Sequence, residues 1–591
     1  MRVLGISLGH DSSAALVEDG RLKGIMEAER YFRQKRYKLH CVTLDAGRHA
    51  SGFQYVQLAD LIEFLGQVAA RWGRSFDAVA VQNQGRTDEF DNLLVLLGRE
   101  GFTYSSTTHV DHHLSHASLA YYTSPFDRAI VLSYDGMGND GFTVLFKGEG
   151  NRLDYLERDS HQFGRSYNNV GYVIGIKPDV AGSTAGKSMG LAAYGELRSD
   201  WLPFAREYVA TYQKLSPLPV EGLSSYGKSH RINSAGLDRI PDLRSYVRKA
   251  ATAGTGLRAT VGALLGASQT ELVLPGPDNA LSQSLMHTVQ HAWTEEVLSV
   301  LEKFSAHSRN LCVVGGCALN GVTNYVIQER QRFNRCYFLP NPTDCGLSGG
   351  AALHTYYART DAPFAGIEQT LTPYLGAEPF DAAMLPSLRQ RYPHRRFAGS
   401  EQDLAARLAS LIHRDRIVGV IRGPYEVGPR ALGNRSILCN PLNPSMRDIL
   451  NERVKHREWY RPFAPVVTSE DASRYFTNAA DIPYMSVICY TRDEYRSRLP
   501  SITHVDGSAR LQTVTAAQHP FIHAALKAFE RLSGFPILLN TSFNPGGEPI
   551  LNFCSVGLGM LDSTQMDLVL IGDEFFCRPG NERLLDETAL T

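Results

Sequence analysis

The sequence predicts an α/β protein of two domains, and three observations support this. The chain has 591 residues, which is too long for one ordinary hydrophobic core. Short apolar runs bounded by turn residues alternate with helical patterns in both halves of the chain. The composition changes between residues 355 and 400, where turn-forming and basic residues are typical of a linker. We therefore expect a first domain over residues 1–365, a linker over 366–395, a second domain over 396–580 and a tail over 581–591.

The N-terminal half contains the same pattern twice. Residues 1–30 predict a strand, a glycine turn and a hairpin that closes at Asp19-Gly20, and residues 128–156 repeat that plan. A further buried strand runs into a glycine turn at residues 311–324. Paired hairpins of this kind resemble the actin-like ATPase fold, in which two related halves enclose a nucleotide. The first domain is therefore expected to be a duplicated, actin-like α/β domain.

Helices are expected where apolar residues recur every three or four positions. This spacing is found over Phe64–Trp72 and over Asn279–Phe304. The segment 215–260 lacks it and is rich in Pro, Ser and Arg, so we expect an insertion or lid there. Beyond the linker, residues 402–423 predict a helix followed by a buried strand, and strands and helices continue to alternate as far as about residue 580.

Charge and composition exclude several classes of protein. The chain has 60 basic and 61 acidic side chains, so nothing favours a nucleic-acid partner. The N-terminus does not resemble a signal peptide, and no run of about 18 apolar residues predicts a membrane span. The nine cysteines form no CxxC pair, which argues against a zinc finger. We expect a reduced, cytoplasmic protein that binds neither nucleic acid nor a membrane.

Two histidines spaced four residues apart suggest a metal site. His112 and His116 would share one face of a helix, although such a pair alone is more often a surface or capping feature. Two carboxylates strengthen the case, because Asp135 ends a predicted strand and Asp344 lies in a strand-end loop. This mixture of donors suits a divalent transition metal such as Fe(II), Mn or Zn, and the sequence does not choose among them.

Three further residues in the first domain are candidates for chemistry. His10 follows the first glycine turn, where a histidine can deprotonate a substrate hydroxyl, although bonding to its own loop is the commoner role. Lys35 lies in a basic cluster that can reach a phosphate, and such clusters are more often solvated surface. Lys187 lies among small residues that resemble a phosphate loop but lack the spacing of a P-loop.

The second domain contains four polar or basic clusters in rigid turns. Arginines in Gly/Pro-rich turns are pre-set to bind phosphate or carboxylate through two hydrogen bonds. The alternative is a set of unrelated, solvent-facing turns. Four clusters in a chain without basic excess favour anion binding over that alternative. The residues concerned are Arg430 and Arg435; Lys455 and Arg461; Arg510; and Asn540, Thr541, Ser542 and Asn544.

Together these motifs resemble the NodU/CmcH (TobZ-like) family of O-carbamoyltransferases over about residues 1–575. The resemblance rests on HDSSA, HHLSHA, AGKSMGLAAYG, VVGGCALN, EVGPRALGNRSIL, WYRPFAP and LNTSFNPGGEPI. It implies a first domain similar to the actin-like (ASKHA) fold of the tRNA threonylcarbamoyl-transferases and a YrdC-like second domain. The second domain would form carbamoyladenylate from carbamoyl phosphate and ATP. The first would transfer the carbamoyl group to a hydroxyl at a metal centre.

The resemblance also implies a role for each matching residue. His10 matches the catalytic histidine that activates the acceptor hydroxyl, and the metal is usually iron, with Mg accompanying ATP. The implied metal ligands are His112, His116, Asp135 and Asp344. The resemblance implies Lys35 as a nucleotide contact, and we also expect the nucleotide or carbamoyladenylate to contact Asp135, Gly136, Lys187, Gly315, Gly316 and Asn320. The implied carbamoyl-phosphate pocket is Arg430, Lys455, Arg461, Arg510, Asn540 and Ser542.

The acceptor and some alternatives stay open. A small-molecule alcohol, such as a natural product in antibiotic biosynthesis, is expected as acceptor. The first loop lacks the insertion of several antibiotic-modifying members, so acceptor contacts cannot be transferred. The alternatives are a tRNA threonylcarbamoyladenosine-type enzyme, a hydrogenase-maturation carbamoyltransferase (its CxxC fingers and acylphosphatase domain are missing) and a non-catalytic actin-like nucleotide-binding protein. The oligomeric state is open, a homodimer being the commonest arrangement.

Overall fold

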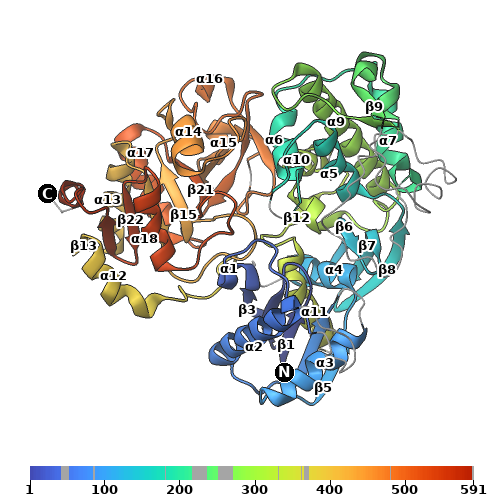
Figure 1. Cartoon of the computed structure of the whole chain (residues 1–591), viewed down its shortest axis with the longest axis horizontal. Coiled ribbons are helices and arrows are strands. Elements are labelled where there is room, and N and C mark those ends of the chain that lie inside the picture. Colours follow the sequence, from blue (N-terminus) through green and yellow to red (C-terminus); the bar gives the residue numbers. More distant parts are fainter. Residues whose placement is uncertain are drawn as a thin grey trace.

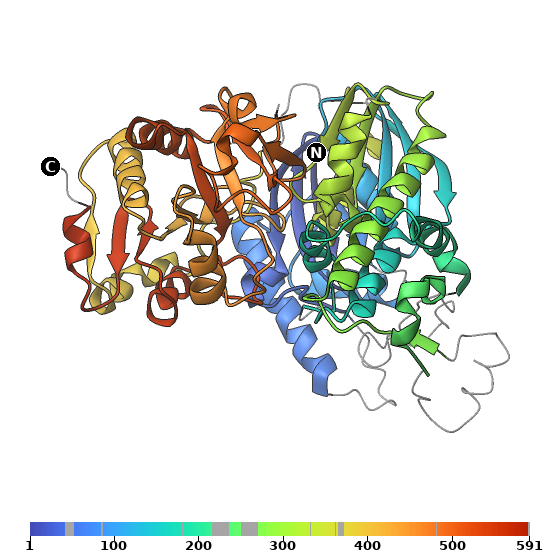
Figure 2. The ribbon, with the colours of Figure 1, turned by 90° about the horizontal axis from the view of Figure 1, so that it is seen from above.

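The protein was examined as a computed structural model, in which the two halves of the chain lie side by side (Figures 1 and 2). The blue-to-green N-terminal half forms one side and the orange-to-red C-terminal half forms the other. The structure describes residues 1–41, 52–83, 87–179, 182–215, 236–249, 270–330, 332–360, 362–364, 372–479 and 481–588. Within these ranges, no helix combines the length and the apolar character needed to cross a membrane.

The N-terminal half is built from two sheets with the same topology. The first has the order β3-β2-β1-β4-β5 and the second has the order β12-β11-β6-β7-β8. In each, three antiparallel strands that follow one another in the chain are extended by two parallel strands. The first sheet contains β1 (Arg2–Ser7), β2 (Ser13–Glu18), β3 (Arg21–Glu27), β4 (Ala78–Gln82) and β5 (Ser106–His109). The second contains β6 (Arg128–Gly138), β7 (Gly141–Glu149), β8 (Arg152–Asp159), β11 (Asn310–Val314) and β12 (Arg335–Phe338). The predicted duplication is confirmed.

Helices α4 (His112–Tyr122) and α11 (Leu347–Arg359) pack against each other between the two sheets. Small residues make this contact possible. A Cβ atom added to Gly350 of α11 would lie 1.8 Å from the carbonyl oxygen of Ser115 in α4. A Cβ atom added to Gly5 of β1 would lie 1.9 Å from the carbonyl oxygen of Ser348. Glycine at both positions lets the backbones approach to a distance that any side chain would prevent.

The other helices of this half surround the two sheets. Those associated with the first half are α1 (Ala28–Phe32), α2 (Gly52–Trp72) and α3 (Thr87–Arg99). Those of the second are α5 (Phe163–Val173), α6 (Ala185–Ala192), α7 (Leu202–Leu215), α9 (Ala280–Glu302) and α10 (Gly321–Glu329), with a small ribbon of β9 (Val247–Lys249) and β10 (Thr270–Leu272). Helices α2 and α9 confirm the two helices expected from apolar spacing. The lid expected over 215–260 lies mostly outside the described residues, which include only 215 and 236–249 of it.

The C-terminal half is centred on an eight-stranded mixed sheet with the order β13-β23-β22-β14-β15-β21-β16-β20. Helices α13 (Glu401–His413) and α17 (Pro520–Ser533) pack together and share an apolar core with its strands. The sheet consists of β13 (His394–Arg396), β14 (Val418–Ile421), β15 (Arg435–Cys439), β16 (Ala464–Thr468), β20 (Gln512–Val514), β21 (Ile537–Ser542), β22 (Leu568–Ile571) and β23 (Glu574–Cys577). The helix and strand predicted over 402–423 are confirmed as α13 and β14. A Ser400/Asp403 capping box begins the helix.

Shorter elements complete this half. A second sheet contains β17 (Phe476–Thr477), β18 (Ile488–Thr491) and β19 (Ser508–Arg510). The remaining helices are α12 (Leu385–Arg391), α14 (Met446–Ile449), α15 (Ala472–Tyr475), α16 (Asp493–Arg496), α18 (Cys554–Ser563) and α19 (Arg583–Asp586). The predicted linker segment thus carries α12 and leads into β13, which pairs with β23. The predicted tail carries α19, whose Leu584 and Leu585 are buried. The predicted α/β fold class is confirmed in both halves.

Candidate active site

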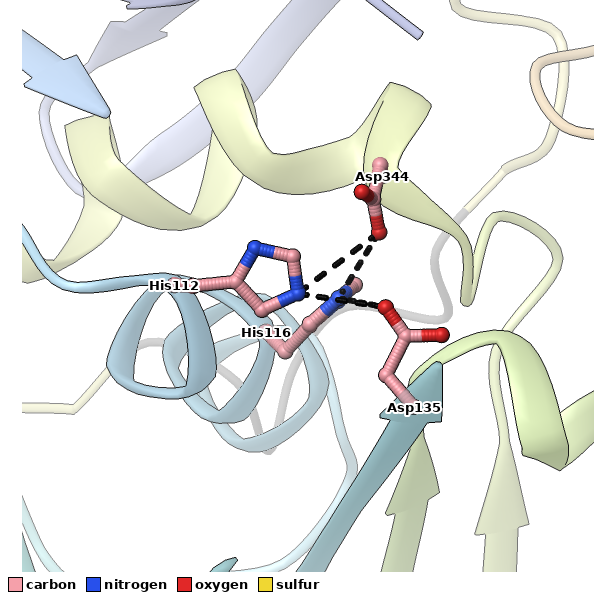
Figure 3. Close-up of side chains that lie close together, drawn as sticks. All are labelled: His112, His116, Asp135 and Asp344. Carbon is pink, nitrogen blue, oxygen red and sulfur yellow. Dashed lines mark hydrogen bonds and ion pairs between the residues drawn. The ribbon is translucent and has the colours of Figure 1, made fainter. Parts of the chain in front are cut away.

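Four side chains from both halves of the N-terminal domain converge on one point, and we call them the His/Asp cage (Figure 3). His112 and His116 lie one turn apart on α4, Asp135 lies in β6, and Asp344 lies at the start of the short 3₁₀ helix before α11. The Nε2 atom of His112 is 3.1 Å from Oδ2 of Asp135 and 3.7 Å from Oδ1 of Asp344. The Nε2 atom of His116 is 3.2 Å from Oδ1 of Asp344 and 3.7 Å from Oδ2 of Asp135.

Backbone contacts orient two members of the cage. Oδ1 of Asp135 accepts a hydrogen bond from the N–H of Gly316 at 2.9 Å, so its other oxygen faces the imidazoles. The N–H of His112 donates to Oδ1 of Asn139 at 2.9 Å, which fixes the first turn of α4. The glycine turn after β11 therefore orients one carboxylate of the cage through a hydrogen bond, in addition to any ligand that the turn binds.

The four donor atoms fit a single divalent ion. They lie within 4.8 Å of one another. An ion about 2.1 Å from each donor keeps neighbouring donors about 3.0–3.5 Å apart, and the ion-pair distances here run from 3.1 to 3.7 Å. Two imidazoles with two carboxylates are a mixed set of nitrogen and oxygen donors that suits a transition metal ion.

Charge is balanced inside the cage. Burial opposes a charge on His116, but its bonds to Asp135 and Asp344 outweigh burial and raise its pKa to about 9. In the same way burial opposes ionisation of Asp135, and the two imidazoles nevertheless hold the pKa of that carboxyl well below its usual value. Each buried charge therefore has a partner of opposite sign.

His10 lies beside the cage, in the loop between β1 and β2. Its Nδ1 atom is 3.0 Å from Oδ2 of Asp11 and 3.2 Å from Oδ2 of Asp344. Burial disfavours the charged imidazole, but Asp344 and Asp11 outweigh it and raise the pKa of His10 to about 9. His10 is therefore protonated in this arrangement. It would accept a proton only when another cation neutralises the charge of Asp344.

Lys35 and Arg36 form a turn after α1 that we call the bridging turn. The backbone N–H of Gly9 bonds to Leu39 at 3.0 Å, which ties this segment to the His10 loop. Burial lowers the pKa of Arg36, but four acidic residues outweigh it, and both Asp135 and Asp344 of the cage are among them. Burial lowers the pKa of Lys35, with a further lowering from Arg461 of the second domain. The bridging turn thus lies within electrostatic range of the cage on one side and of the second domain on the other.

Five basic residues of the second domain lie close enough to repel one another, and we call them the cation cluster: Arg430, Lys455, Arg457, Arg461 and Arg510. Burial and the charges of Arg510 and Arg461 hold the pKa of Arg430 well below its ordinary value. Burial and Arg461 lower the pKa of Arg510 to about 10. In the described part of the chain, Arg430, Arg457 and Arg510 form no ion pair with a carboxylate, and Arg461 has one long pair with Glu458, at 3.7 Å.

The cation cluster also has unsatisfied hydrogen-bond donors. The Nε atoms of Arg430 and Arg510 are buried without a hydrogen-bond partner among the described residues. Several partly buried guanidinium groups without a counter-charge are costly unless an anion neutralises them. The cluster is therefore suited to an anionic ligand with several oxygens, such as a phosphate.

Sequence comparison places the chain in a family. The family described as Carbamoyltransferase N-terminus matches residues 2–353, and Carbamoyltransferase C-terminus matches residues 409–578. The chain belongs to the carbamoyltransferase family. Nodulation protein U of Sinorhizobium fredii (strain NBRC 101917 / NGR234) is 30% identical, over 93% of this chain and 94% of that protein. Nodulation protein U of Rhizobium tropici is 29% identical, over 93% of this chain and 92% of that protein.

Solved structures are only distantly similar to this carbamoyltransferase. HypF of T. kodakarensis aligns with a TM-score of 0.29 and 11% identity, over 60% of this chain and 48% of that chain. The ROK hexokinase of Thermus thermophilus aligns with a TM-score of 0.26 and 16% identity, over 61% of this chain and 100% of that chain. At these scores the structural likeness adds nothing to the family assignment. The family assignment itself confirms the predicted resemblance and the prediction that the chain is an enzyme.

Three predicted anion-binding residues of this carbamoyltransferase form hydrogen bonds to other residues of the protein. Nζ of Lys455 donates to the carbonyl of Ser542 at 2.6 Å and to Oδ1 of Asn544 at 2.7 Å. Oγ of Ser542 donates to the same Oδ1 at 2.6 Å. Nδ2 of Asn540 donates to Gln512 at 2.8 Å and to the carbonyl of Ala431 at 3.1 Å. The Oδ1 atom of Asn540 is buried without a partner among the described residues. Asn540 therefore provides the free hydrogen-bond acceptor among these three residues.

The hydrogen-bond partners of Arg435 differ from those predicted from its Gly/Pro-rich turn. Its guanidinium is fully buried and donates to Oδ1 of Asn552 at 2.8 Å and to the backbone carbonyls of Arg422, Gly423 and Asn434 at 2.8–3.1 Å. The interpretation of Arg435 as an anion-binding fork is therefore wrong. The residue holds the backbone of the turn that presents Arg430.

The predicted nucleotide-binding residues fall into different surroundings. Gly136 directly follows Asp135 in β6, and Gly315 and Gly316 form the turn that bonds to it. A Cβ atom on Gly315, whose φ is +94°, would lie 2.2 Å from the carbonyl oxygen of Tyr134. By contrast, the Asn320 side chain caps α10 and bonds to buried Gln290 at 3.1 Å. Lys187 on α6 is paired across the domain interface with Glu458 at 2.5 Å.

Sequence reasoning missed Arg36 and Arg457. Arg36 directly follows Lys35 in a basic cluster, and its place beside the cage depends on the fold of the loop. Arg457 lies between Lys455 and Arg461 in the NERVKHREWYRPFAP stretch. Burial and the charges of Arg461 and Arg510 hold its pKa well below the ordinary value. The basic spacing of that stretch was the available signal.

Proposed function

We propose that this carbamoyltransferase is an ATP-dependent O-carbamoyltransferase that works in two steps on carbamoyl phosphate and a small-molecule alcohol. The second domain, taken as residues 396–580, would form carbamoyladenylate from carbamoyl phosphate, ATP and water, releasing phosphate and pyrophosphate. The first domain, taken as residues 1–365, would transfer the carbamoyl group to the acceptor and release AMP. A natural product is the class of acceptor that we propose.

One observation supports this proposal above the others. The cage and the cation cluster both act electrostatically on the bridging turn, the cage on Arg36 and Arg461 on Lys35. Residues suited to polyphosphate anions and residues suited to a cation thus act on the same short turn. We propose that the intermediate passes along this turn from one site to the other, enclosed from water that would hydrolyse it.

The cation cluster is proposed to bind the reactants of the first step. Arg430, Arg461 and Arg510 offset the charge of two anions that must be brought together. The free Oδ1 of Asn540 is suited to the carbamoyl amide, because an amide N–H₂ is a hydrogen-bond donor. Lys455 and Ser542 maintain the shape of the pocket.

The His/Asp cage is proposed to hold Fe(II), and Mg is proposed to accompany ATP. A divalent ion in the cage supplies a Lewis acid that polarises a carbonyl or phosphoryl oxygen. His10 is proposed to take the proton from the acceptor hydroxyl. Gly316 keeps Asp135 oriented, and Lys35 and Arg36 offer positive charge to the phosphate of the adenylate.

Pyrophosphate release tests the first step without an acceptor. The purified protein is mixed with ATP and carbamoyl phosphate, and in parallel with ATP, threonine and bicarbonate. The proposal expects pyrophosphate and carbamoyladenylate only in the first mixture. Pyrophosphate only in the second mixture would instead indicate a threonylcarbamoyl enzyme. Nucleotide binding without turnover in either would indicate a non-catalytic protein.

A further inference from the structure

A buried ion pair in the N-terminal domain contacts the loop that presents Arg430. Glu27 ends β3 and Arg30 lies in α1, and their side chains are 1% and 0% exposed. Nε of Arg30 donates to Oε2 of Glu27 at 2.9 Å. We call this pair the latch. Burying two charges is favourable only when their remaining hydrogen bonds are also satisfied, so the partners of the latch decide what it does.

Every remaining partner of the latch that the structure shows lies in the second domain. The Nη2 atom of Arg30 donates to the carbonyl oxygens of Glu426 at 3.0 Å and Gly428 at 2.7 Å. Its Nη1 atom donates to the carbonyl oxygen of Ile550 at 3.2 Å. In return, the N–H of Gly428 donates to Oε1 of Glu27 at 2.7 Å. The latch thus binds both backbone groups of Gly428.

Gly428 has no freedom to move away from the latch. Its φ is +95°, and a Cβ atom there would lie 2.3 Å from the carbonyl oxygen of Pro340 in the N-terminal domain. Pro429 follows, with a fixed φ, and Arg430 comes next. Any shift of Gly428 is therefore carried through one stiff residue to the backbone of Arg430.

The second domain holds the same loop from its other side. Oε1 of the buried Glu426 carboxylate accepts from the N–H of Leu432 at 2.6 Å and from that of Arg435 at 3.2 Å. Nδ2 of Asn540 bonds to the carbonyl oxygen of Ala431. The segment from Glu426 to Leu432 is thus clamped between its own domain and the latch, and Arg430 lies within it.

We infer that Glu27 and Arg30 are positioning residues for the anion site of the other domain. They set Arg430 for carbamoyl phosphate without touching the ligand. This inference rests on the proposed function for its substrate. It adds that adenylate formation in the second domain depends on two residues of the first.

The test compares the double variant Glu27→Gln/Arg30→Met with a matched control. Replacing both members avoids leaving one buried charge alone. The control is Arg33→Gln, because Arg33 also crosses the interface, to Glu548 at 2.8 Å, but it lies in an exposed pair whose hydrogen bond goes to Glu548 and not to residues 426–432. Pyrophosphate release is measured against carbamoyl phosphate concentration, together with thermal melting.

The double variant is expected to raise the KM for carbamoyl phosphate by about tenfold or more, with a smaller change in kcat. Transfer from supplied carbamoyladenylate and bound metal should stay within about twofold of the parent protein, as should every value for Arg33→Gln. A folded double variant with the control's KM would overturn the inference.

Two further measurements keep the inference testable. If the double variant does not fold, the KM for carbamoyl phosphate is measured in Arg30→Lys instead. The ammonium of lysine keeps the charge but cannot reach Glu27 and three carbonyl oxygens at once. An unchanged KM in Arg30→Lys would then reject the latch. If the parent protein releases no pyrophosphate, the proposed function fails, and the dissociation constant for inorganic phosphate, measured by calorimetry, replaces the KM. Equal phosphate affinity in parent and variant would reject the latch alone.

Discussion

The His/Asp cage and the cation cluster both act electrostatically on the bridging turn, and they balance buried charge in opposite ways. In the cage, each imidazole faces a carboxylate. The pKa of His116 is raised and that of Asp135 is lowered, and both shifts favour the charged form. In the cluster, Arg430, Arg457 and Arg510 lie near other arginines, and burial and the repulsion of these neighbours lower their pKa values. The cage is complete without an anion, whereas the cluster needs one. The comparison separates a group of side chains whose charges balance one another from a group whose charge balance needs an added anion.

His10→Ala gives the largest expected difference between the two sites. Transfer from supplied carbamoyladenylate should fall about a thousandfold, because a positioned general base contributes on the order of 10²–10⁴. Pyrophosphate release from ATP and carbamoyl phosphate should stay within about twofold. Exposed His307 provides a control, and His307→Ala should change neither rate. If His10→Ala stopped adenylate formation and spared transfer, the division of labour between the domains would be wrong.

Arg510→Ala should produce the reverse pattern. Pyrophosphate release should fall by about a hundredfold or more, because a partly buried guanidinium that stabilises phosphate charge is lost. Transfer from supplied carbamoyladenylate should remain. Arg492 is an exposed arginine of the same domain, and Arg492→Ala should behave as the parent protein. Normal pyrophosphate release in Arg510→Ala would remove the cation cluster from the mechanism.

His112→Ala and His116→Ala test the cage as a cation site. Each should reduce bound metal to about a tenth or less, since two imidazoles provide half of the donors. Metal is measured by elemental analysis of the purified protein, with exposed His394→Ala as control. Transfer should decline together with the metal while pyrophosphate release continues. Full metal content in both variants would reject the ligand assignment.

Inorganic pyrophosphate should stabilise the protein through the cation cluster. At about 100 times its dissociation constant, a ligand adds about 2.7 kcal/mol to folding stability, which amounts to a few degrees in melting temperature for a chain of this size. The shift should be seen by differential scanning fluorimetry and should shrink strongly in Arg510→Ala. An equal shift in both proteins would place pyrophosphate elsewhere.

Much of the fold followed from local patterns. The repeat of strand, glycine turn and hairpin predicted the two matching sheets, and apolar spacing predicted α2, α9 and α13. The HxxxH spacing placed His112 and His116 on one helix face. Residues that are distant in sequence but close in space were harder to predict. Asp135 and Asp344 were predicted because residues at the ends of strands gather at one edge of a sheet.

What sequence reasoning could not supply was the direction of each side chain. Arg430 and Arg435 lie in the same Gly/Pro-rich turn. Arg430 joins the cation cluster, whereas the guanidinium of Arg435 donates hydrogen bonds to backbone carbonyls. Asn320 likewise follows the glycine turn but faces the buried Gln290. A pattern of residue types does not state which way a side chain points, because tertiary packing decides that.

The close contact between Gly350 and Ser115 limits what can be changed in this protein without touching a functional group. Ser115 lies between His112 and His116 on α4, and α11 follows Asp344 after two residues. One methyl group at position 350 would push these helices apart and pull the histidines from the aspartate. A survey that scores only charged and polar positions would pass over this glycine, although the spacing of the His/Asp cage depends on its having no side chain.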